Sequence, residues 1–260
     1  MMMLALLLLQ TPTPVSYHFP EQPCNYAIDI KLKGFIPLFG ANEATAELQV
    51  GLKLSSQTPD SDNNPKATAT LDTVKILLNG SILPFGKETF NQYFPLNVTL
   101  TPQGKVVKNN SPDIEMPVHL PGLDIKHVPE ITYLAIEFPA EGIQQGKSWT
   151  YTRQFKDSDV TYTVTPTAIT GDTANLDVSM TQDYEDQEGD AFEVAKNPKD
   201  ATYNVKTHVE GKGKVVFDLK KGLIRKFHLD ADAAGNVTNI ETKAVTKRDL
   251  KTNMDVDLKS

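Results

Sequence analysis

Cysteine is almost absent from this sequence of 260 residues, since Cys24 is the only one. No disulfide can therefore form within the chain. A lone cysteine beside a first strand is more typical of a small buried hydrophobe than of a reactive thiol. An exported protein without disulfides suits a bacterial envelope better than a eukaryotic secreted module.

Basic charge is also scarce. The 26 Lys and Arg residues stand against 33 Asp and Glu, which gives a net charge of −7 and a pI near 5.3. A general nucleic-acid binder normally presents a basic face, so the composition argues against a nucleic-acid partner. The apolar run from Met1 to Leu9 is far shorter than the ~20 residues of a spanning helix. The sequence therefore predicts no transmembrane span.

Motifs that carry chemistry are missing as well. None of the histidines lies at close metal-ligand spacing from another; they are His18, His119, His127, His208 and His228. No nucleophile elbow, phosphate loop or dinucleotide fingerprint is present. Carboxylates are spread over the chain without a recognisable acid/base pair. The sequence predicts no metal, no cofactor and no catalytic residue, and favours a non-enzyme over a hydrolase whose site assembles from distant strands.

Residues 1–14 are expected to form a signal peptide and leader, because the apolar run is followed by a polar segment with two prolines. Lys and Arg are missing before the run, and no small-x-small cleavage site is evident. A misplaced start codon would explain why Lys and Arg are missing. An apolar first strand or a tail is the alternative. The expected location is the periplasm or the exterior of a bacterial cell.

Alternating apolar and polar residues dominate the rest of the chain. Ala44 to Leu54 is among the clearest runs, and Trp149 to Met180 repeats the pattern around a Gly171-Asp172 turn. A period of two indicates strands with one buried and one wet face. Eleven residues make about 35 Å of strand, which favours a large curved sheet or open half-barrel. The predicted fold is all-β and mainly antiparallel, with one or two short covering helices.

The chain divides into two β-rich segments. Residues 15–120 are expected to form an N-terminal half and residues 140–260 a C-terminal half. Residues 121–139 are a proline-rich connector, because prolines at this density forbid a central strand. Whether the halves are separate units or parts of one long sheet stays open.

Several polar or glycine-containing segments predict interruptions of the strands. Asp183 to Asp190 holds five carboxylates, and a solvated loop is favoured there over a weak cation site. Gly211 to Gly213 predicts a break, and Ala234 to Asn236 a turn. Ser55 to Pro65 predicts a polar loop.

An aromatic cluster interrupts the strand pattern between Ile82 and Phe94. Phe90 and Phe94 stand four residues apart before Pro95, which predicts a short helix covering an apolar sheet face. The cluster is either the lid of a core or the lining of a ligand pocket. The candidate ligand-binding residues are Phe85, Phe90, Tyr93 and Phe94.

Basic side chains gather on one later hairpin; they are Lys212, Lys214, Lys220, Lys221, Arg225 and Lys226. Such a group can contact an anionic lipid surface or a polyanion. Lysines on turns and wet strand faces also keep a β-sheet edge soluble, and this second interpretation is favoured.

Two short patterns carry a resemblance. They are the Phe138-Pro139…Gly146-Lys-Ser-Trp149 junction and Gly213-Lys-Val-Val-Phe217-Asp-x-x-x-Gly222-Leu-Ile. They resemble a group of exported bacterial proteins of unknown function, over roughly Phe138 to Leu229. The long-stranded plan is also similar in architecture to the half-barrels of periplasmic lipoprotein carriers. The resemblance implies no site residue.

The leading functional hypothesis is an exported, non-enzymatic protein that binds an apolar ligand or lipid in the concavity of its sheet. Long one-sided strands and the aromatic cluster motivate it. The alternative is a structural or interaction module of the bacterial envelope, with a protein partner and no small-molecule ligand.

Overall fold

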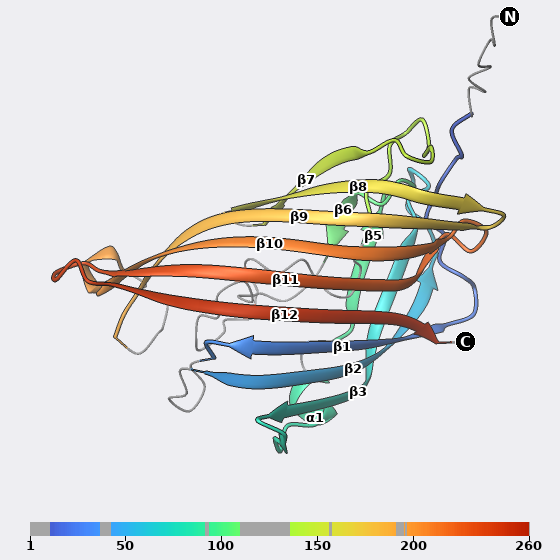
Figure 1. Ribbon diagram of the computed structural model, residues 1–260. Helices are drawn as coiled ribbons and strands as arrows, with labels where there is room; N and C mark the ends of the chain where they lie inside the picture. Colours follow the sequence, from blue (N-terminus) through green and yellow to red (C-terminus); the bar gives the residue numbers. More distant parts are fainter. Residues whose placement is uncertain are drawn as a thin grey trace, which may run out of the picture.

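In the computed structural model, one antiparallel sheet of twelve strands makes up most of the protein (Figure 1). The structure describes residues 11–36, 43–91, 94–109, 136–155, 158–190, 195 and 197–259. The first strands are β1 (Cys24–Gly34), β2 (Ala44–Gln57), β3 (Lys66–Leu78), β4 (Ser81–Ile82), β5 (Leu96–Leu100) and β6 (Val106–Asn109). The later strands are β7 (Trp149–Phe155), β8 (Ser158–Thr170), β9 (Thr173–Glu188), β10 (Tyr203–Asp218), β11 (Leu223–Asn239) and β12 (Val245–Lys259).

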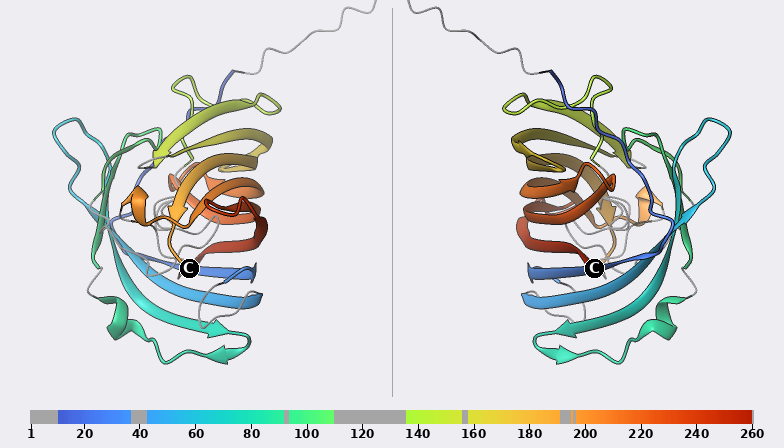
Figure 2. Two further views of the ribbon diagram at one scale, coloured as in Figure 1. Left: turned by 90° about the vertical axis from the view of Figure 1, so that its left-hand side faces the viewer. Right: turned by 90° about the vertical axis from the view of Figure 1, so that its right-hand side faces the viewer.

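The strand order is β6-β5-β3-β2-β1-β12-β11-β10-β9-β8-β7, and the short β4 pairs with β3. Within the described ranges no pairing joins β6 to β7, so the sheet has two free edges. Figure 2 shows the sheet curled into an open half-barrel, with β7 at one rim. The predicted all-β, mainly antiparallel, curved open sheet is therefore confirmed.

The two predicted segments occupy separate blocks of the same sheet. Strands β1–β6 come from residues before the connector, and β7–β12 come from residues after it. The antiparallel pairing of β1 with β12 joins the blocks, with Ile28 opposite Val256. Only residues 136–139 of the predicted connector lie in the described part of the chain. The domain boundaries themselves stay a prediction.

Alternation explains why one face of the sheet is buried. In β9 every second residue from Ala174 to Tyr184 is buried, and the intervening residues are exposed or half-buried. The pairing registers align such positions into rows that run across the sheet from β7 to β3. One row consists of Trp149, Val164, Val178, Gly213, Leu229, Met254, Ile30, Leu48 and Ile76. These rows form the concave face, and charged residues occupy the convex face.

The hairpin predicted around Gly171 is confirmed, since the residue has φ +55° in the turn between β8 and β9.

Cys24 begins β1 and is half-buried, and burial raises the pKa of its thiol. It packs against the core as a small hydrophobe, as the sequence suggested.

The breaks predicted at two glycine-containing segments are wrong. Gly211 and Gly213 lie inside β10, and Gly235 lies inside β11. None of the three has a positive φ. A Cβ on Gly213 would lie 2.1 Å from the His228 carbonyl oxygen, and one on Gly235 would lie 2.8 Å from the Arg248 carbonyl oxygen. Gly213 and Gly235 therefore allow neighbouring strands to approach closely in a strongly curved sheet.

The predicted loop at Asp183 to Asp190 is also wrong through Glu188, because β9 continues to that residue. Gln182 and Tyr184 are buried while Asp183 and Glu185 are exposed. The acidic residues therefore belong largely to the wet face of a strand whose other face is in the core. The high charge density of this segment suggested a loop, but the alternation of buried and exposed residues continues into the segment.

A short helix is present where it was predicted. Helix α1 (Lys87–Phe90) follows β4 and packs beside β3. Its own residues include none that is fully buried. A single turn of 3-10 helix, Pro198–Asp200, lies between β9 and β10.

Candidate functional site

An accessible apolar surface lies on the concave face of β1, β2 and β3. The pairing register places Ile28, Ile30 and Leu32 beside Val50, Leu48 and Ala46, and these beside Val74, Ile76 and Leu78. All nine positions share one face of the sheet. Ile28 and Ile30 are buried, and the other seven are only half-buried. These seven residues are called the accessible wall: Leu32, Ala46, Leu48, Val50, Val74, Ile76 and Leu78.

The strands of the accessible wall present a polar opposite face. Lys31 lies between Ile30 and Leu32, Glu47 and Gln49 lie beside Leu48, and Lys75 lies between Val74 and Ile76. A one-residue shift of register would turn the apolar set to the charged side, so the alternation fixes which face is concave.

The concave face of β8, β9 and β10 differs, because its side chains are almost fully buried. Val160, Val164, Ala174 and Phe217 are 0 % exposed. These strands form the buried wall, which consists of Val160, Tyr162, Val164, Ala174, Leu176, Val178, Met180, Val205, Val209, Val215 and Phe217. The buried wall has the packing of an ordinary core.

Aromatic rings pack together at one end of the buried wall. Phe217 meets Tyr17 at 5.2 Å and Phe138 at 4.9 Å between ring centroids, both edge to face. Phe138 also packs on Trp149 at 6.0 Å. The backbone N–H of Ile136 donates to the Tyr17 hydroxyl at 2.7 Å. The segment before β1 thus lies against the segment before β7, although the sequence pattern gave no sign of this contact.

A polar group lies among the apolar side chains near the free edge β7. Arg153 Nε lies 3.1 Å from Glu137 Oε1, and the two side chains are 11 % and 18 % exposed. The rings of Tyr151 and Tyr162 stack at 5.0 Å, and the Arg153 guanidinium lies over both, at 5.6 and 5.9 Å. Burial raises the pKa of Tyr151 to about 12 and raises that of Tyr162 further, so both phenols stay protonated.

Two buried hydroxyls of the concave face lack hydrogen-bond partners in the described part of the chain: Tyr162 Oη on β8 and Thr207 Oγ1 on β10. Tyr162 is 6 % exposed and Thr207 is 2 % exposed. By contrast, the Tyr26 hydroxyl on β1 donates to the Ile224 carbonyl oxygen at 2.9 Å. Buried polar groups are normally paired, so the two unpaired hydroxyls call for an explanation.

The far end of the concave face holds a buried ion pair. Arg248 of β12 binds Glu188 of β9, and both side chains are at least nine-tenths buried. The Arg248 guanidinium also lies 4.7 Å from the centre of the Phe35 ring. Two strands separate β9 from β12 in the sheet, so strong curvature must bring these side chains together.

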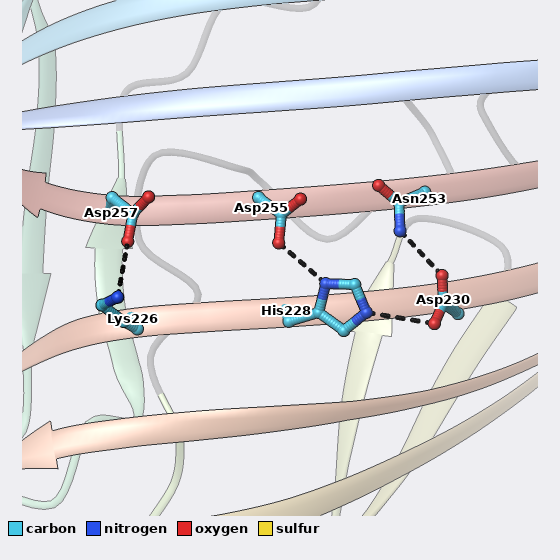
Figure 3. Close-up of polar contacts among 6 residues, drawn as sticks. All are labelled: Lys226, His228, Asp230, Asn253, Asp255 and Asp257. Carbon is cyan, nitrogen blue, oxygen red and sulfur yellow. Dashed lines mark hydrogen bonds and ion pairs between the residues drawn. The ribbon is translucent and has the colours of Figure 1, made fainter.

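The convex face carries a ladder of polar contacts, which Figure 3 shows for β11 and β12. His228 Nδ1 lies 2.7 Å from Asp255, its partner on β12, and His228 Nε2 lies 3.0 Å from Asp230. The hydrogen bond to Asp255 is the main cause that raises the pKa of His228, and the hydrogen bond to Asp230 raises it further. His208 repeats the arrangement on β10 with Asp183. These side chains are partly exposed, so the contacts lie on a solvent-facing side of the sheet and contribute little to stability.

The lysine-rich hairpin joins this ladder. Lys212 stands opposite Asp230 in the register, and Lys226 Nζ lies 3.8 Å from Asp257. A groove of about 480 Å³ on β2, β1, β12 and β11 likewise has both signs of charge along it, from Lys31, Lys33, Lys251, Glu47, Asp230 and Asp232. This mixture fits lysines on the wet face of the sheet. The predicted role at a sheet edge is wrong, because β10 and β11 each pair with a strand on both sides.

The aromatic residues predicted from sequence lie in and around helix α1, which contacts β3. Phe85 is 43 % exposed, while Phe90 and Phe94 are half-buried and pack against the core. Tyr93 lies outside the described residues. Whether these residues bind a ligand stays a prediction. The accessible wall was missed as a site because every member looks like an ordinary strand residue.

The described residues form neither a metal site nor a membrane-spanning helix. Among the described residues, no group of three or more His, Cys, Asp or Glu is arranged to hold a metal ion. None of the helices in the described ranges has the length and apolar character needed to cross a membrane.

Comparisons with known proteins identify a likeness of fold alone. No protein-family model and no curated protein matches the sequence. A solved structure described as lipid-protein interactions in lipovitellin superposes with a TM-score of 0.51 at 14 % identity. The match covers 93 % of this chain and 25 % of the lipovitellin chain, so this chain spans about a quarter of that protein's length. The chain therefore shares a large open β-sheet with a region of lipovitellin.

Proposed function

We propose that the protein is an exported, non-enzymatic binding protein for an apolar ligand or lipid, held against the concave face of its sheet. The observation that carries this proposal is the accessible wall. Seven apolar side chains from three adjacent strands remain only half-buried on the face that elsewhere forms the core. A contiguous apolar surface of this kind marks a place where another apolar body binds.

The fold supports the same proposal. The structure described for lipovitellin concerns lipid-protein interactions, and this chain resembles part of it in fold. Fold alone does not decide function, so the weight rests on the surface itself. An open half-barrel also provides free edges past which a ligand can reach the concave face.

Export and the absence of catalysis complete the proposal. The apolar run from Met1 to Leu9 supports export. The accessible wall presents aliphatic groups alone, which bind by burial rather than by proton or group transfer.

Native mass spectrometry of the full-length protein beside an organic extraction tests the proposal. We expect a co-purifying apolar molecule that is recovered in the organic phase. A protein that carries nothing after purification, and takes up no fluorescent apolar probe when titrated, would contradict it. A stable protein partner in the same preparation would instead favour the envelope interaction module.

A further inference from the structure

We propose that the ligand is a neutral lipid with a hydrogen-bond acceptor in its head, such as an acylglycerol, and that the Tyr162 hydroxyl binds that head. This inference rests on the proposed function and deepens it, since it names the class of lipid and the residue that orients it. The acyl chain then extends across the concave face to the accessible wall.

Tyr162 provides the first part of the argument. Its side chain is more than nine-tenths buried on the concave face, and its hydroxyl finds no partner in the described part of the chain. An unpaired buried hydroxyl costs free energy that a phenylalanine of almost the same shape would avoid. Because burial raises the pKa of this phenol, the group stays a neutral donor. A buried donor without a partner is satisfied when an oxygen acceptor on an otherwise apolar ligand comes within hydrogen-bond distance.

The charges near Tyr162 argue for a neutral head. Arg153 lies over the Tyr162 ring and is paired with Glu137 at 3.1 Å. An anionic head that approached the guanidinium would also meet the Glu137 carboxylate, in a place where water screens charge weakly. An ester carbonyl or a hydroxyl accepts a hydrogen bond from Tyr162 without adding charge.

The register connects Tyr162 with the accessible wall. One row of the concave face runs from Tyr162 through Met180, Gly211, Ala231, Thr252, Leu32, Ala46 and Leu78. Five strand spacings of about 4.8 Å separate Tyr162 from Leu32, or about 24 Å along the curved sheet. A lipid chain covers about half of a ~30 Å bilayer core, or about 15 Å, so a chain that starts at Tyr162 reaches Leu32 only across the concavity and not along the curved sheet.

The position of Tyr162 near the edge strand β7 explains why the lipid head binds at the buried wall. Tyr162 lies on β8, one strand inside the free edge β7. Polar concave-face residues gather on this side of the sheet, where Gln182 Nε2 donates to Ser158 Oγ at 2.9 Å and Thr207 holds the second unpaired hydroxyl. The accessible wall is apolar throughout. An amphipathic molecule matches this division.

The test compares three probes of similar chain length with the full-length protein: monoolein, sodium oleate and octadecene. Each is titrated against a bound fluorescent apolar probe, in the unaltered protein and in Tyr162→Phe. We expect monoolein to bind the unaltered protein more tightly than oleate or octadecene. Tyr162→Phe should weaken monoolein binding about tenfold, the scale of one net hydrogen bond, and change octadecene binding less than twofold.

Tyr26→Phe is the matched control, because the Tyr26 hydroxyl already has a partner inside the protein. It should lower thermal stability while leaving the ratio of monoolein to octadecene affinity unchanged. Tyr162→Phe should leave thermal stability unchanged or slightly higher, which shows that any loss of binding is not a loss of folding.

Two results overturn the inference while leaving the proposed function intact: equal monoolein affinity in Tyr162→Phe and the unaltered protein, or tighter binding of oleate than of monoolein. Failure of all three probes to bind the unaltered protein overturns the proposed function together with the inference.

Discussion

The two walls of the half-barrel are built from the same alternating pattern but differ in burial. Val164 on the buried wall is 0 % exposed and meets a complete shell of neighbours, whereas Leu48 on the accessible wall, in the same row of the sheet, is only half-buried. Tyr162 of the buried wall carries an unpaired hydroxyl, and the ion-paired Arg153 lies beside it on the edge strand β7, while the accessible wall is purely aliphatic. The contrast suggests separate tests of stability and of binding. Full burial on the buried wall stabilises the fold, and the accessible wall is the proposed surface for the apolar part of a ligand.

The largest expected effect is on stability at the buried wall. Phe217→Ala removes a fully buried ring that packs on Tyr17 and Phe138, and should lower the free energy of unfolding by about 3–5 kcal/mol. Val50→Ala on the half-buried accessible wall should cost about 1 kcal/mol. Urea denaturation monitored by the single tryptophan measures both. Equal losses would remove the distinction between the walls.

A second large effect is expected at the far end of the concave face. Arg248→Met should lower the free energy of unfolding by about 3 kcal/mol, because it leaves the buried Glu188 carboxylate without this charge partner. Glu188→Gln should restore part of the loss when it is added to Arg248→Met. Denaturation of the single and double variants gives the coupling between β9 and β12, and an additive pair would show that the contact carries no energy.

The sequence predicted the sheet well because alternation is a local signal. The strand around Ala44 and the turn at Gly171 could be recognised from neighbouring residues alone. Gly213 was misinterpreted because a glycine that allows strands to approach closely looks the same in sequence as a glycine in a turn. The acidic run after Asp183 was misinterpreted because its charge obscured the alternation.

The candidate site could not be predicted in the same way. Burial of Leu48 depends on what lies across the concavity, and pairing of the Tyr162 hydroxyl depends on residues far away in the chain. Neither property is encoded in a short window. The predicted aromatic residues Phe85, Phe90 and Phe94 were chosen because clustered rings are visible in sequence, whereas an aliphatic surface assembled from three strands is not.

A smaller effect, on ligand uptake, distinguishes the two faces of one strand. Leu48→Asp places a carboxylate on the accessible wall and should weaken uptake of an apolar probe about tenfold. Gln49→Asp places the same charge on the convex face of β2, one residue away, and should leave uptake unchanged. Fluorescent probe titration measures both, after circular dichroism has confirmed that each variant is folded. A similar loss in the two variants would count against binding on the concave face.

The smallest effect concerns the convex face and pH. Carboxylates raise the pKa of His208 and His228 in the folded protein, Asp183 chiefly for the first and Asp255 for the second. A raised pKa means that the stabilisation is complete below the unfolded value of about 6.5 and is lost as pH rises through the folded value. Unfolding at pH 6 should therefore cost more free energy than at pH 9, by about 0.5 kcal/mol for each histidine in such an exposed pair. His208→Gln with His228→Gln should remove this part of the pH dependence, and an unchanged pH profile would contradict the assignment.

Photo-crosslinking with a monoacylglycerol that carries a diazirine at the end of its acyl chain tests the central account most directly. After irradiation and proteolysis, mass spectrometry should locate the label on peptides of β1, β2 and β3 that contain the accessible wall. A label confined to the convex face, or spread evenly over the molecule, would contradict the account that this protein binds lipid in the concavity of its sheet.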